Sequence, residues 1–85
     1  MKKFRFIITH NLIEGTEKRD LTSEQRKETP YYFEVFDDDG ELYFKGYSND
    51  SESEDAFIPM DAYQNSYGCT EIKYRNRNTG KMEVL

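Results

Sequence analysis

Cysteine is nearly absent from this chain, because Cys69 is the only one in 85 residues. A single thiol cannot form a disulfide within the chain, and it cannot supply the several thiolates of a cysteine-based zinc site. A lone cysteine at the start of a strand-like segment commonly behaves as a small buried hydrophobic residue. The fold must therefore be stabilised without a disulfide framework.

The groups that catalysis uses are also scarce. His10 is the only histidine, and nothing in the spacing places it beside Cys69 to form a nucleophile–base pair. The five glycines are scattered singly, so the chain has no glycine-rich phosphate-binding loop. Carboxylates are numerous, and no pair is singled out for acid–base work. We therefore expect a protein that is not an enzyme and needs no cofactor, with a divalent-metal enzyme using some of the carboxylates as the rival.

Long hydrophobic runs are missing too. The apolar stretch after the basic start covers only Phe6, Ile7 and Ile8, which is far shorter than the core of a secretion signal or a membrane span. We expect a soluble, cytoplasmic protein.

Aromatic residues are plentiful, with seven Tyr and six Phe but no Trp. A chain of 85 residues predicts one small domain, spanning residues 1–85, with a thin core. Phe and Tyr bury much area per residue and suit such a core.

The hydrophobic pattern predicts an α+β fold: a mainly antiparallel sheet of four or five strands with one or two short helices. Alternating or β-rich segments predict strands at 2–10, 31–37, 41–48, 69–75 and 81–85. A short helix is expected within 21–30, capped by Thr22 or Ser23 and ended by Pro30. One or two helical turns within 56–68 are expected to be broken at Pro59.

The segments 31–37 and 41–48 predict a hairpin whose tight turn takes positive φ angles at Asp39 and Gly40. Both segments carry aromatic residues on both faces, which predicts a central hairpin with one covered face. In the second segment, simple alternation predicts Leu42 and Phe44 on one face of the strand and Tyr43 and Tyr47 on the other.

Charge is distributed unevenly along the chain. The net charge is −5, yet residues 31–62 hold ten acidic residues and one Lys, whereas the flanking parts are each slightly basic. Such asymmetry bears on partners and solubility. The acidic block is therefore the strongest functional feature of the sequence.

We expect the acidic block to form two clusters at opposite ends of the predicted hairpin, about 20–25 Å apart. Glu34, Lys45, Tyr43 and Tyr47 would form a ridge between them, and Tyr43, Tyr47 or Tyr63 would supply anchoring area. Two anionic clusters on an elongated face resemble a row of phosphates. The candidate partner-binding residues are Asp37, Asp38, Asp39, Glu41, Tyr43, Tyr47, Asp50, Glu52, Glu54 and Asp55.

The clustered carboxylates of the turn Asp37–Gly40 also suggest a calcium-binding site. If Gly40 were the loop glycine of a helix–loop–helix calcium site, Val35 and Gly46 would have to be ligands, so that motif fails. An irregular calcium site stays open as an alternative, and no metal site is assigned.

Direct nucleic-acid binding is not expected. Lys73, Arg75, Arg77 and Lys81 form a small basic patch, joined by Lys2, Lys3 and Arg5 if the first strand lies nearby. The acidic centre of the chain would repel a phosphate backbone.

The leading hypothesis is a small acidic binding protein whose partner is a basic protein surface. The more specific form of this hypothesis is a phage or mobile-element inhibitor that mimics nucleic acid and blocks a host nucleic-acid-binding protein, such as a defence nuclease. Many phage-encoded inhibitors of host defence, anti-CRISPR proteins among them, are similar in size and acidity. Three alternatives remain: an acidic surface that only maintains solubility, the metal-dependent enzyme, and a module that self-associates through a strand edge or aromatic face.

Overall fold

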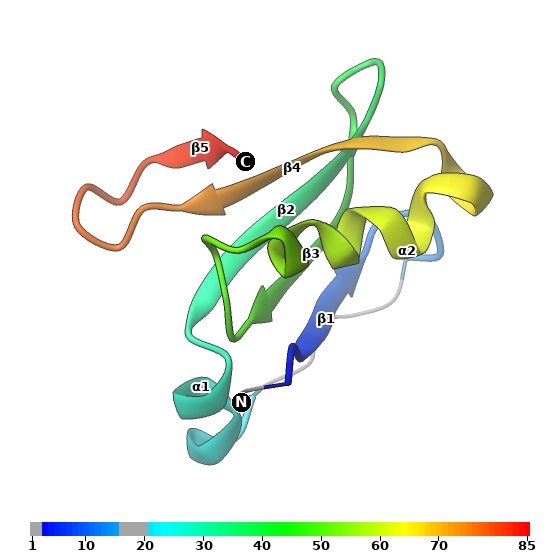
Figure 1. The fold of residues 1–85 in the computed structure, drawn as a ribbon. Coiled ribbons are helices and arrows are strands. Elements are labelled where there is room, and N and C mark those ends of the chain that lie inside the picture. The colour runs from blue at the N-terminus through cyan, green and yellow to red at the C-terminus, as the bar shows by residue number, and fades with distance from the viewer. Residues whose placement is uncertain (1–2, 16–20) are drawn as a thin grey trace.

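A computed structural model describes residues 3–15 and 21–85 and shows a five-stranded antiparallel sheet with two α-helices (Figure 1). The sheet order is β1-β3-β2-β4-β5, so the β2–β3 hairpin is central, as expected. The predicted α+β class is confirmed. The elements are β1 (Phe6–Asn11), α1 (Ser23–Glu28), β2 (Tyr31–Asp37), β3 (Leu42–Ser48), a 3-10 turn η1 (Glu54–Phe57), α2 (Ile58–Tyr67), β4 (Cys69–Arg75) and β5 (Met82–Val84).

Helix α1 begins where its capping residues predict. The Thr22 hydroxyl accepts the Gln25 backbone N–H at 3.1 Å, and the Gln25 side chain accepts the Thr22 N–H at 2.9 Å. This reciprocal capping box satisfies two N–H groups that the first turn leaves without helical partners. None of the six helical residues is buried, and α1 lies near the start of β1, where Arg5 pairs with Glu28 at 3.8 Å (Figure 1).

Helix α2 corrects the expectation for Pro59. Pro59 lies in the first helical turn and begins the helix instead of breaking it. The missing N–H of proline costs nothing there, because the first-turn N–H groups have no helical acceptor. The helix ends at Gly68, whose φ of 69° is the left-handed conformation that a C-terminal cap commonly uses.

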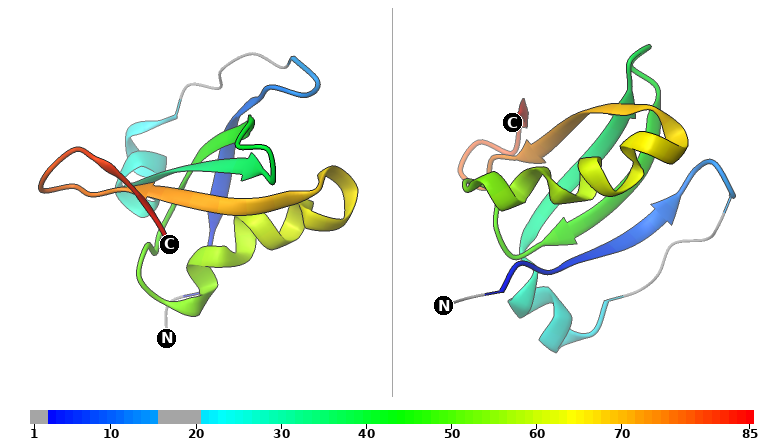
Figure 2. Two further views of the ribbon diagram at one scale, coloured as in Figure 1. Left: turned by 90° about the horizontal axis from the view of Figure 1, so that it is seen from above. Right: turned by 45° about the vertical axis from the view of Figure 1, so that its right-hand side comes forward.

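Helix α2 lies over one face of the sheet, as the two views in Figure 2 show, and the core side chains lie between the two. Its largest fully buried side chains include Phe33, Val35, Phe44 and Ile72, which come from the three central strands. The Phe44 ring stacks on Tyr63 of α2 at a centroid distance of 4.0 Å. Neither α-helix in the described part of the chain has the length and apolar content of a membrane span.

Three bulges shift the register of the sheet. Each leaves one residue without an opposite partner: Thr9 in β1, Tyr43 in β3 and Thr70 in β4. The bulge at Tyr43 sets Leu42 opposite Phe36 and brings Tyr43 against the core. The alternation expected from the sequence, with Leu42 and Phe44 on one face, is therefore wrong at Leu42 and Tyr43.

The first strand does not extend the basic patch. Strands β1 and β5 are the two opposite edges of the sheet, so Lys3 and Arg5 lie away from the β4–β5 hairpin. Lys2 lies outside the described residues.

Candidate binding surfaces

The β2–β3 turn projects beyond the sheet at one end of the molecule (Figure 1). The Gly40 N–H donates to the Asp37 carbonyl at 3.1 Å, and the Asp37 N–H donates to the Glu41 carbonyl at 3.0 Å. Gly40 has a φ of 81°, and no described non-glycine residue has a positive φ. The expected positive φ at Asp39 is therefore wrong, because the left-handed glycine closes a longer loop than the tight two-residue turn.

Asp37 holds this turn together from inside. Its carboxylate Oδ1 accepts the backbone N–H of Asp39 at 2.9 Å and that of Glu41 at 2.8 Å, and the residue is buried. The hydrogen bond from Glu41 is the main reason that the pKa of Asp37 lies below its ordinary value, and a bond from the Tyr43 hydroxyl adds to it. Asp37 is thus a structural residue of the turn. The exposed carboxylates that remain form the acidic tip: Asp38, Asp39 and Glu41.

A second group of carboxylates follows β3. The Asp50 carboxylate accepts the backbone N–H groups of Glu52 at 2.9 Å and Ser53 at 3.1 Å, so Asp50 organises its loop much as Asp37 organises the turn. The Ser53 hydroxyl accepts the Asp55 N–H at 3.2 Å and caps η1. The exposed carboxylates here form the loop cluster: Glu52, Glu54 and Asp55.

The acidic tip and the loop cluster lie at opposite ends of the hairpin, because Tyr31 pairs with Ser48 at one end and Phe36 with Leu42 at the other. Seven-residue strands separate them by about 20–25 Å. The face between them is mixed in charge, since Glu34 is paired in register with Lys45 on one side and Lys73 on the other. The two clusters are thus separate patches and not one anionic row.

The sheet face opposite α2, called here the aromatic face, carries half-buried tyrosine and phenylalanine side chains. Tyr47 lies here beside Tyr32, with ring centroids 5.3 Å apart, and Arg75 covers the Tyr32 ring at 5.0 Å. The Tyr32 hydroxyl donates to Glu34 at 2.8 Å, and burial is the main cause of the raised pKa of this tyrosine. Lys73 similarly covers Phe36 at 4.8 Å. These cations lie over rings of their own sheet.

The three tyrosines expected as anchors are therefore divided between surfaces. Tyr47 is on the aromatic face, Tyr43 lies on the α2 side next to Tyr67, and Tyr63 stacks on Phe44 in the core. Only Tyr43 is close to the acidic tip, where its carbonyl accepts the Leu12 N–H at 2.9 Å.

An apolar groove adjoins the acidic tip. This tip groove, with a volume of about 660 Å³, is lined by Leu12, Ile13, Glu41, Leu42, Tyr43, Ser66 and Tyr67. Sequence analysis missed Leu12 and Ile13, although two adjacent apolar residues in an otherwise polar connection were a usable signal.

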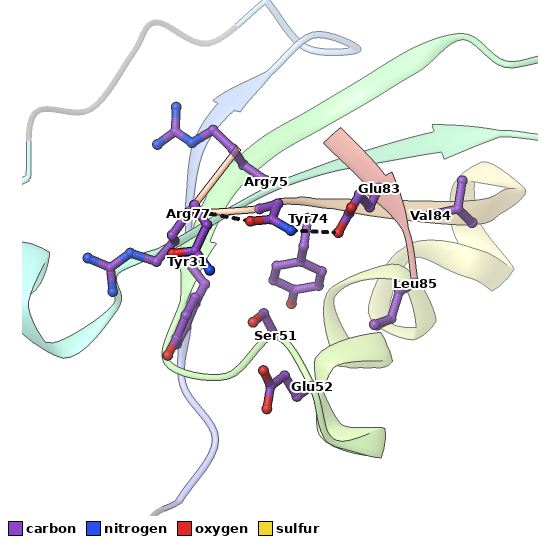
Figure 3. Close-up of a pocket in the computed structure, with 11 residues that line it drawn as sticks. Tyr31, Ser51, Glu52, Tyr74, Arg75, Arg77, Glu83, Val84 and Leu85 are labelled. Carbon is purple, nitrogen blue, oxygen red and sulfur yellow. Dashed lines mark hydrogen bonds between the residues drawn. The ribbon is translucent and has the colours of Figure 1, made fainter. Parts of the chain in front are cut away.

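A second hollow lies between the β4–β5 hairpin and the loop after β3 (Figure 3). It has a volume of about 280 Å³, and Figure 3 shows Glu52 and Ser51 on one side of it and Tyr31 and Tyr74 beside them. The Tyr74 hydroxyl donates to the Ala56 carbonyl at 2.9 Å and accepts from Ser48 at 3.2 Å, so both of its hydrogen bonds lie within the core. Arg77 covers the Tyr31 ring at 5.7 Å.

The residues considered for catalysis are kept apart. His10 is in β1 and Cys69 in β4, with β3 and β2 between them. Cys69 is buried, which raises the pKa of its thiol. A Cys–His nucleophile pair is thus excluded by topology.

The structure does gather three carboxylates at the turn. Ligand atoms of Asp37, Asp38 and Asp39 lie within 4.8 Å of one another. However, Asp37 Oδ1 already accepts two N–H groups, so the cluster offers a cation fewer free lone pairs than its composition suggests.

Comparison with known proteins gives no further guide: no family model matches this chain, and neither does any curated protein or solved structure.

Proposed function

We propose that this chain is a small, non-enzymatic protein that binds a basic protein surface through its acidic tip. The observation that carries the proposal is the exposure of Asp38, Asp39 and Glu41 on a projecting turn that Asp37 fixes from within. The two ion pairs among the described residues involve Glu28 and Glu71, so no described cation forms an ion pair with the tip.

A nucleic-acid-binding protein is the partner that suits the acidic tip, because a phosphate-binding groove presents clustered Lys and Arg to an anionic ligand. The proposed role is an inhibitor that occupies such a groove, for instance on a defence nuclease. The proposal places this action in the cytoplasm, where an unpaired thiol such as Cys69 stays reduced.

A capture experiment tests the proposal. The immobilised protein is incubated with bacterial lysate in a salt series, with and without excess duplex DNA. We expect a partner that DNA displaces and that salt releases. The matched variants are a tip reversal (Asp38→Lys, Asp39→Lys, Glu41→Lys) and a loop reversal (Glu52→Lys, Glu54→Lys, Asp55→Lys), which change the net charge equally.

Loss of capture on tip reversal alone would support the tip as the contact. Capture that survives both reversals would contradict the proposal, because binding would then not depend on the acidic residues. A calorimetric titration with Ca²⁺ or Mn²⁺ addresses the rival enzyme: tight binding of either ion would favour a metal-dependent activity.

A further inference from the structure

We propose that the tip groove binds a protein segment that presents a large apolar side chain flanked by Lys or Arg. This inference rests on the proposed function and specifies which side chains the partner of the acidic tip presents.

The first reason is unusual apolar exposure in the groove. Leu12 is 47% exposed and Ile13 is 42% exposed, and they are adjacent in the chain. Leu42, Tyr43 and Tyr67 continue this apolar lining. Contiguous exposed apolar area rimmed by polar residues is typical of a protein-binding site, whereas single exposed residues are ordinary.

The second reason is that the groove is held in shape by hydrogen bonds. The Leu12 N–H donates to the Tyr43 carbonyl at 2.9 Å, which continues the β1–β3 pairing beyond the strand. The Asn11 side-chain oxygen accepts the N–H groups of Ile13 and Glu14, each at 3.1 Å. A preorganised apolar surface binds with a smaller entropic cost than one that must first be ordered.

The third reason is the charge around the groove. Among the residues that the structure describes, Glu41 is the one charged residue that lines it; Glu14 follows Ile13, and Asp38 and Asp39 precede Gly40 at the adjoining turn. This rim disfavours a second copy of the chain, which would bring an identical acidic tip into contact. It favours a segment whose apolar residue has cations beside it.

The test uses a labelled 12-residue synthetic peptide of alternating Leu and Lys pairs. One control peptide has Ser in place of Leu, and another has Glu in place of Lys. Binding is followed by fluorescence anisotropy, and the contact is mapped by amide chemical shifts in the 15N-labelled protein. We expect shifts at the tip groove and the acidic tip, and binding about tenfold weaker for the Ser control.

Two variants separate the groove from the tip. The double substitution Leu12→Ser, Ile13→Ser removes exposed apolar groups and should weaken Leu–Lys peptide binding about tenfold, with an unchanged unfolding midpoint. The tip reversal should weaken binding of both basic peptides, and the loop reversal should leave it within about twofold.

If Leu12→Ser, Ile13→Ser binds as the wild type does while tip reversal abolishes binding, the groove inference fails and the proposed function stands. If neither variant affects binding, both fail. Amide shifts confined to the aromatic face, or no binding at millimolar peptide, would also overturn the inference. This mapping uses the unmodified protein and does not depend on a variant that folds.

Discussion

The Tyr74 hydroxyl makes two hydrogen bonds inside the core. It joins β4 to the Ala56 carbonyl at 2.9 Å and to Ser48 of β3 at 3.2 Å, in a buried site. Tyr74→Phe should lower the free energy of unfolding by about 1–2 kcal/mol, because the buried Ala56 carbonyl loses this donor and the Ser48 hydroxyl keeps only its hydrogen bonds with Asp50. Urea unfolding measures this. Tyr31→Phe is the control, since the Tyr31 hydroxyl makes no hydrogen bond within the described residues; an equal loss in both variants would contradict the assignment.

The raised pKa of Tyr74 predicts that the fold loses stability at alkaline pH. Burial raises the pKa of Tyr74 to about 12, from an ordinary value of 10.0. Its contribution to stability is therefore complete below pH 10 and is lost as the pH rises through about 12, because the unfolded chain ionises first. Unfolding midpoints measured from pH 8 to pH 12 should fall more steeply for the wild type than for Tyr74→Phe. Parallel curves would mean that other groups cause the alkaline loss.

The lowered pKa of Asp37 predicts that the fold loses stability at acidic pH. Hydrogen bonds, first of all that from the Glu41 N–H, lower the pKa of Asp37 below its ordinary value of 3.8. The stability that this carboxylate contributes is present above the unfolded-state pKa and is lost as the pH falls through the folded-state value. Asp37→Asn keeps an acceptor for the turn but removes the titrating group. The difference in unfolding free energy between wild type and variant should shrink from pH 6 to pH 2, and a constant difference would contradict this role.

At the scale of the strand, Gly46 allows β3 to lie between its two neighbours. A Cβ at this position would be 2.2 Å from the Ile7 carbonyl oxygen and 2.8 Å from the Phe33 ring. Gly46→Ala should therefore lower the free energy of unfolding by about 1–3 kcal/mol, since the backbone of β1 must move. Thr70→Ala, at an exposed bulge position of β4, should change it by less than about 0.5 kcal/mol. Chemical denaturation compares the two, and a neutral Gly46→Ala would show that β1 is not tightly placed.

The elements that local chemistry determines were predictable from the sequence, and those determined by neighbouring strands were not. The capping residue Thr22 and the hairpin segments 31–37 and 41–48 depend on nearby residues, and they were found in the right places. The side of the sheet on which Tyr43 lies depends on a bulge, which arises from pairing with β2 and leaves no pattern in the strand itself. Leu12 and Ile13 gave a local signal for the tip groove, but the groove as a whole was not predictable, because Leu12 and Tyr67 come to line one groove only through the fold.

At the scale of the whole molecule, salt determines how much of the acidity a partner can sense. The acidic tip and the loop cluster are about 20–25 Å apart, whereas the Debye length is about 30 Å at 0.01 M salt and 8 Å at 0.15 M. At low salt the partner is therefore steered by the total charge of −5. At physiological salt only the cluster next to its docking site acts on it.

The tip and loop reversals test this salt dependence through the rate of association. Each replaces three carboxylates with Lys and changes the net charge from −5 to about +1, so the two variants differ only in where the charge lies. At 0.01 M salt both should slow association of the Leu–Lys peptide by similar factors. At 0.15 M the tip reversal should still slow it several-fold and the loop reversal should not, because screening removes the distant cluster. Stopped-flow fluorescence measures both rates; equal effects at 0.15 M would mean that the peptide responds to net charge and does not dock beside the acidic tip.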